Sequence, residues 1–116
     1  MSKYGVSPAA HRTYRGQTFD SKAEMNRYIE LLAMERVGLI RNIELQPEYL
    51  LIPGYKHPVH GTFRAMRYRA DFRYLETSTN RVLVEDVKGM LTDKYRIKKM
   101  ILLWKYPDIH FVEVKA

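Results

Sequence analysis

The chain has 116 residues, of which 46% are hydrophobic and 12% aromatic, enough for one domain with a buried core, which excludes wholesale disorder. The absence of cysteine excludes a disulfide framework and a thiolate metal site, and no apolar run approaches the ~20 residues that cross a bilayer. The net charge of +7 favours a polyanionic partner, because the basic excess is concentrated in residues 1–19, 53–75 and 88–105. Since no signal-peptide pattern is recognisable, we expect a cytoplasmic location.

Residues 1–19 lack periodicity and contain several turn-forming residues, which predicts an irregular or mobile basic arm with a short extended piece at residues 13–19. One domain over residues 20–116 is expected to follow it. Arg12 and Arg15 lie among tyrosines in this arm and are candidates for contact with a phosphate backbone. A solvated tail is the alternative interpretation.

The clearest predicted helix covers residues 21–37. Ser21 suits its N-cap and Gly38 its end, and Ser21 with Glu24 fits a capping box. The alternative is that Glu24 points toward the sheet and acts as a metal ligand or orients a water molecule. The apolar stripe is expected at three- and four-residue spacing: Met25, Tyr28, Ile29 and Leu32.

Residues 40–52 predict an extended segment interrupted at Pro47. Gln46 is a polar residue inside this segment. Its side chain is either hydrogen-bonded at the edge of a sheet or faces an active site. Residues 53–63 hold two glycines and two prolines, which predicts a mobile surface loop that can touch DNA.

A long strand is predicted over residues 64–76, followed by a turn at 77–80 and a second strand over 81–88. Alternation places one set of side chains of the first strand on one face and a charged set on the other. The apolar set is Tyr68, Ala70, Phe72 and Tyr74, and the charged set is Arg67, Arg69, Asp71 and Arg73. The charged face is either part of a functional site or a solvent-exposed surface with ion pairs.

Counting outward from the turn places Asp71 opposite Asp86 on the neighbouring strand. Strand parity puts Asp86 and Lys88 on one face and Glu85 on the other, bonded to a neighbouring helix. Two facing carboxylates are destabilising unless a cation lies between them. This arrangement predicts a metal site, with Glu85 as the competing candidate for the second acid.

The second predicted helix covers residues 92–105, with Thr92 as its cap. The basic residues of this helix either flank the backbone of a bound nucleic acid or form a solvated surface. We expect its buried stripe to be Ile97, Met100, Ile101 and Trp104. A final strand is predicted over residues 109–114.

These side chains suit phosphodiester hydrolysis, which needs a polarised phosphoryl group, an activated water and a stabilised leaving oxygen. Mg²⁺ or Mn²⁺ is bound by hard oxygen ligands, here Asp71 and Asp86 with the Val87 carbonyl. Lys88 would orient or deprotonate the attacking water, or neutralise charge on the phosphorane. No small organic cofactor is expected.

Five stretches together resemble the PD-(D/E)XK nuclease superfamily, whose fold is that of the restriction endonucleases. The closer similarity is to small phage and prophage endonucleases described as Holliday junction resolvases. The similarity covers roughly residues 14–110. Its motifs in chain order are FDSKAEMNRYIEL, GLIRNIELQPEYLL, YRADFRY, VEDVKG and TDKYRIKKMILLWKYP.

The resemblance implies an α/β core in the order α-β-β-β-α-β, with a mixed sheet flanked by helices. It makes Asp71 and Asp86 the motif acids, Lys88 the motif lysine, Glu24 the helix acid and Gln46 a supporting glutamine. It implies a metal-dependent endonuclease for branched DNA, a two-fold homodimer and the cytoplasm of a bacterial host. Nicks, flaps or transposon ends are alternative substrates, and a non-catalytic nucleic-acid-binding protein is the alternative class. The expected DNA contacts are Arg12, Arg15, Arg67, Arg69, Arg73, Lys94, Lys98 and Lys99.

Overall fold

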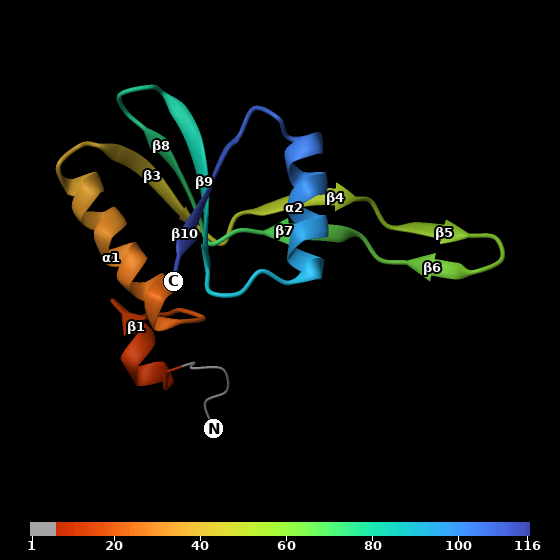
Figure 1. Ribbon diagram of the computed structural model, residues 1–116, viewed down its shortest axis with the longest axis horizontal. Helices are drawn as coiled ribbons and strands as arrows, with labels where there is room; N and C mark the ends of the chain where they lie inside the picture. Colours follow the sequence, from red (N-terminus) through yellow and green to blue (C-terminus); the bar gives the residue numbers. More distant parts are fainter. Residues whose placement is uncertain (1–6) are drawn as a thin grey trace.

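The computed structural model describes residues 7–116 and places a four-stranded mixed sheet between two helices (Figure 1). The strand order is β10-β9-β8-β3, with β9 and β10 parallel and the other pairs antiparallel. This confirms an α/β fold whose main elements follow the predicted order α-β-β-β-α-β. The elements are α1 (Lys22–Arg36), β3 (Ile40–Leu45), β8 (Phe72–Glu76), β9 (Arg81–Lys88), α2 (Asp93–Lys105) and β10 (His110–Lys115).

The core has two halves, one on each face of this sheet. On the α1 side, Phe72 and Leu83 pack with Leu31 of the helix. On the α2 side, Val84 packs with Leu102. Because side chains alternate along β9, successive residues of this strand face α1 and α2 in turn. The charged end of β9 therefore contributes to two separate environments.

Helix α1 begins where the sequence predicts, since the Ser21 hydroxyl accepts a hydrogen bond from the Glu24 backbone N–H at 3.1 Å. Two residues of the predicted stripe, Met25 and Tyr28, pack against the core as expected. The fully buried residue is Leu31, however, and Ile29 and Leu32 are only half-buried. Glu24 lies seven residues before Leu31 and is also buried, so it shares that face. Glu24 therefore lies on the buried face of α1. Its role as a metal ligand or water-orienting group stays a prediction.

Helix α2 also begins at its predicted cap, Thr92, whose hydroxyl accepts from the Tyr95 N–H at 3.1 Å. The predicted buried stripe is wrong. Tyr95 and Leu102 are the buried residues, and Ile101 is half-buried. The rest of the predicted stripe is exposed to solvent: Ile97, Met100 and Trp104, the last at 80%. Two apolar stripes occupy this helix, and periodicity alone does not say which one meets the sheet.

The extended segment at residues 40–52 is broken at Pro47, as predicted, into β3 and β4 (Glu48–Ile52). The single strand predicted over 64–76 is wrong, because it divides into β7 (Met66–Arg69) and β8. β7 pairs with β4, whereas β8 lies in the main sheet. The break at Ala70 also changes the face: Tyr68 packs on the α2 side and Phe72 on the α1 side.

The loop predicted at residues 53–63 is instead a β-hairpin, formed by β5 (Tyr55–His57) and β6 (Gly61–Phe63). Figure 1 shows it extending the β4–β7 ribbon well beyond α2. The radius of gyration is 16.4 Å, where about 13 Å is typical of a chain this long, and the projecting hairpin contributes to this extended shape.

The predicted irregular arm is ordered over its described part. A short 3₁₀ turn, η1 (Ala9–Arg12), leads into a small hairpin of β1 (Thr13–Tyr14) and β2 (Gln17–Thr18). Phe19 then enters the core against α1. Residues 1–6 of the predicted arm lie outside the described residues. Over residues 7–116, no helix is long and apolar enough to cross a membrane.

Candidate functional site

The β8–β9 hairpin brings Asp71 and Asp86 together in the predicted register. Phe72 pairs with Glu85, so Asp71, one residue earlier, falls opposite Asp86. The Asp71 backbone N–H donates to Asp86 Oδ1 at 3.1 Å, and the Val87 N–H donates to Asp71 Oδ2 at 2.7 Å. Each carboxylate is therefore held by the backbone of the opposite strand.

Asp86 is fully buried on the α2 side of the sheet. Its Oδ2 accepts a hydrogen bond from the Tyr68 hydroxyl and lies 3.9 Å from Lys88 Nζ. Burial raises the pKa of Asp86 to about 6, while the Lys88 charge and the Asp71 N–H oppose the shift; Glu113 on β10 raises it further. Within residues 7–116, Lys88 is the one cation within ion-pair distance of Asp86.

Glu85 faces the opposite side, as strand parity predicts, and is bonded to helix α1. Arg27 donates to both Glu85 oxygens at 2.8 Å, and the Tyr74 hydroxyl donates to Oε2. The bonds to Glu85 raise the pKa of Arg27. This bidentate pair occupies both carboxylate oxygens, so Glu85 fixes α1 to the sheet and lies apart from the pocket beside Asp71.

A pocket of about 430 Å³ lies between the start of α1 and the end of β9. We call it the acid pocket, since Asp20, Glu24 and Asp71 line it, together with Val87 and Lys88. Burial and the charges of Asp71 and Asp20 raise the pKa of Glu24 to about 8. Burial likewise raises the pKa of Asp71, although the bond from the Val87 N–H opposes it. Negative charge is thus costly in this pocket.

The acid pocket suits a divalent cation by the chemistry of its side chains. Over residues 7–116, no three His, Cys, Asp or Glu side chains are grouped closely enough to hold a metal ion. Mg²⁺, however, is often bound by one or two carboxylates and keeps several waters. Glu24 and Asp71 provide such a pair, and Val87 lines the same space. Asp86, which lines no part of this pocket, lies behind Asp71.

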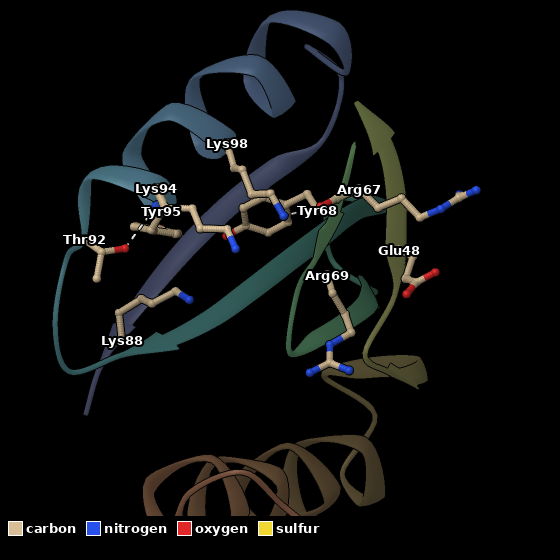
Figure 2. A pocket seen from close by; sticks show the side chains of 9 residues that line it. All are labelled: Glu48, Arg67, Tyr68, Arg69, Lys88, Thr92, Lys94, Tyr95 and Lys98. Carbon is tan, nitrogen blue, oxygen red and sulfur yellow. Dashed lines mark hydrogen bonds between the residues drawn. The ribbon is translucent and has the colours of Figure 1, made fainter. Parts of the chain in front are cut away.

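A second pocket of about 380 Å³, the basic groove, lies between β7 and the start of α2 (Figure 2). In Figure 2, Lys88, Lys94 and Lys98 extend toward the space that Arg69 borders from the other side, while Arg67 reaches past β4. Lys88 lines both the basic groove and the acid pocket. The groove residues are Glu48, Arg67, Tyr68, Arg69, Lys88, Thr92, Lys94, Tyr95 and Lys98.

Four of the predicted DNA contacts lie outside this groove. Arg12 donates to the carbonyls of Ser7 and Phe19 and thereby braces the N-terminal hairpin. Arg73 pairs with Glu44, and Lys99 pairs with Glu113 at 3.1 Å. Each of these three cations has a partner within the fold. Two groove cations have one as well, since Arg69 lies 3.7 Å from Asp20 and Lys98 donates to the Arg67 carbonyl at 2.7 Å. The DNA contacts of all five therefore stay predictions. Arg15, exposed near Tyr14, lies on the N-terminal hairpin.

Gln46 occupies the bend after β3, with a φ of 52°, rather than a strand position. Its backbone N–H donates to the Asp71 carbonyl at 2.9 Å. Gln46 lines neither pocket. Its contact with the site is therefore through the Asp71 backbone.

Sequence reasoning missed two residues around the acids of the site, Asp20 and Tyr68, and one structural residue, Arg27. Asp20 lines the acid pocket, and its position just before the Ser21 cap was a usable signal. Tyr68 was predicted to be buried, but its bond to Asp86 depends on the break between β7 and β8. Arg27 had no signal, because its partner Glu85 lies 58 residues away in the sequence.

The fold and the site define a small α/β protein in which an acidic pocket adjoins a basic groove. The chain belongs to the DUF1064 family, described as a protein of unknown function, whose model matches residues 1–116. No curated protein and no solved structure matches the chain.

Proposed function

We propose that this protein is a metal-dependent DNA endonuclease that acts on branched DNA in the cytoplasm of a bacterial host. The observation that carries the proposal is the position of Lys88. It lies beside Asp86, on the strand that Asp71 contacts, where the acid pocket meets the basic groove. DNA phosphates held in the groove would therefore lie next to the carboxylates.

The chain's own residues divide the task between the two pockets. Glu24 and Asp71 would hold Mg²⁺ or Mn²⁺, which polarises the phosphoryl group and activates water when bound. Asp86 positions the Asp71 backbone from behind. Lys88 orients the attacking water or neutralises developing charge on the phosphate. Arg69, Lys94 and Lys98 bind the backbone phosphates.

The choice of branched DNA rests on the resemblance to phage Holliday junction resolvases. Symmetric cutting of a four-way junction requires two active sites, so the proposal includes a two-fold homodimer. Nicks, flaps and transposon ends are alternative substrates for the same site.

A non-catalytic DNA-binding protein is the second candidate, and one observation favours it. Asp86 is fully buried and already accepts bonds from Tyr68 and Asp71, as a structural carboxylate would. In that case the basic groove would bind phosphates, and the acids would only stabilise the fold.

The test is cleavage of a labelled four-way junction, beside linear duplex of the same sequence, with Mg²⁺ and with EDTA. The variant is Asp71→Asn, and the matched control is Asp108→Asn, which alters an exposed acid near the end of α2. We expect metal-dependent paired nicks in the junction, lost in Asp71→Asn and retained in Asp108→Asn.

Equal cutting of linear duplex would retain the nuclease and reject the junction. Tight binding of all DNAs without metal-dependent cutting would support the non-catalytic alternative.

A further inference from the structure

The projecting hairpin carries an exposed pair of aromatic rings, which we call the aromatic platform. Tyr55 on β5 and Phe63 on β6 lie directly opposite each other in the register. Their ring centroids are 5.1 Å apart with planes at 20°, so the rings stack. Tyr55 is 53% exposed and Phe63 43% exposed. The pair stabilises the hairpin and also presents a flat apolar surface to solvent.

The charge around the platform favours a polyanion over a second protein copy. Residues 49–70 contain no aspartate or glutamate, but they include four basic residues. A second copy with a net charge of +7 would be repelled by this surface, whereas a phosphate backbone would be attracted. The four residues are Lys56, Arg64, Arg67 and Arg69.

The platform is also continuous with the basic groove. β6 leads directly into β7, which carries Arg67 and Arg69, and Figure 1 shows both hairpins in one ribbon. Seven residues separate Phe63 from Asp71, so their Cα atoms are eight steps along the chain and lie at most about 29 Å apart. That is shorter than the ~34 Å of one duplex turn. One DNA molecule can therefore contact the acid pocket and the platform together.

We infer that Tyr55 and Phe63 bind unpaired DNA bases by stacking, while the basic groove holds the neighbouring phosphates. Aromatic side chains accept any base on their faces, but a base inside an intact duplex is already stacked. The platform thus selects DNA with unpaired or branch-point bases. The inference depends on the proposed function only in taking DNA as the polyanion.

The experiment measures binding by the full chain in EDTA, where metal-dependent cleavage does not occur. The probes are a single strand and a four-way junction, each with 2-aminopurine at an unpaired or branch-point position, and a fully paired duplex. The main variant is Tyr55→Leu with Phe63→Leu, which keeps an apolar cross-strand pair. Val59→Ser is the matched control, since it removes an apolar side chain that is 78% exposed on the same hairpin. Tyr55→Trp is the conservative variant.

We expect the wild-type protein to quench 2-aminopurine fluorescence by stacking. The double variant should lose this quenching and bind the single strand and the junction about tenfold more weakly, with duplex affinity unchanged. Val59→Ser and Tyr55→Trp should behave as wild type. Each single leucine variant is measured as well, so that a folding defect in the double variant does not decide the result.

Absence of quenching by the wild-type protein would overturn the inference, as would an equal loss of duplex binding. Sedimentation that shows a wild-type dimer split by the leucine substitutions would instead assign the surface to a second copy. Failure of the protein to cut DNA with Mg²⁺ would remove the proposed activity but leave this binding readout intact.

Discussion

Two adjacent carboxylates on β9, Glu85 and Asp86, are both fully buried, yet their surroundings differ. On the α1 side, Glu85 receives two bonds from Arg27 at 2.8 Å, which neutralise it. On the α2 side, Asp86 has one ammonium group, Lys88, at 3.9 Å. A buried charge that is fully paired holds a fold together, whereas one that is partly paired keeps a raised pKa. The comparison separates an acid that joins a helix to the sheet from one that supports the pocket residue Asp71 from behind.

The largest expected effect comes from removing the partner of Glu85. Arg27→Met should lower the free energy of unfolding by about 3–5 kcal/mol, because it leaves a buried carboxylate without its cation. Urea unfolding at neutral pH measures this effect. Glu30→Ala, which removes the exposed second partner of Arg27, should change stability by less than about 0.5 kcal/mol. Equal effects of the two variants would refute the structural role of the Arg27–Glu85 pair.

A divalent cation should neutralise the carboxylates of the acid pocket, as the Arg27 guanidinium neutralises Glu85. Mg²⁺ or Mn²⁺ at about 100 times its dissociation constant should raise the unfolding free energy by about 2.7 kcal/mol. Asp71→Asn should abolish this gain, because it removes a pocket carboxylate, while Asp108→Asn should retain it. Thermal unfolding with and without EDTA measures the difference. The same gain in all three proteins would show that the cation binds elsewhere.

The raised pKa of Asp86 should appear in the pH dependence of stability. The pKa of Asp86 is about 6 in the folded state against an ordinary value of 3.8, so the folded state binds the proton more tightly. This contribution is present below pH ~4 and is lost as the pH rises through 6, which lowers stability by about 2–3 kcal/mol.

Asp86→Asn should reduce the slope and leave the part that Glu24 and Asp71 contribute through their own raised pKa values. Urea unfolding at several pH values between 4 and 7 compares the variant with wild type. Asp108→Asn, which changes an exposed acid, should keep the wild-type slope. An unchanged slope in Asp86→Asn would show that Asp86 ionises normally.

The smallest effect is expected for the cation beside Asp86. Lys88→Met should cost about 1 kcal/mol or less at neutral pH, because the ion pair is long and Lys88 is partly exposed. The methionine also retains apolar contact with the Tyr95 ring, over which Lys88 Nζ lies at 4.4 Å. Urea unfolding beside Arg27→Met gives the direct comparison. A loss as large as that of Arg27→Met would mean that both acids are equally dependent on their cations.

The sites of the two helix caps and the hairpin register could be predicted because they depend on nearby residues. Ser21 and Thr92 cap their helices through the backbone three positions on. Asp71 and Asp86 face each other because a short turn at residues 77–80 sets the pairing of everything that follows. These features need no information about the rest of the chain.

The buried side of α2 and the course of residues 53–76 could not be predicted in the same way. Helix α2 has two apolar stripes, and only the position of the sheet decides that Tyr95 is buried and Trp104 exposed. Residues 53–63 carry glycines and prolines typical of loops, yet they pair as a hairpin because the β4–β7 ribbon brings their ends together.

The sequence by itself therefore determined where charge and hydrogen-bonding groups fall along each element: the acids, the basic segments, the caps and the turn. The tertiary structure alone decided which of these groups meet. It paired Glu85 with Arg27 across 58 residues, placed Glu24 and Asp20 beside Asp71, and turned Lys88 toward both pockets. Local geometry follows from neighbours in the chain, whereas such encounters depend on how whole elements pack.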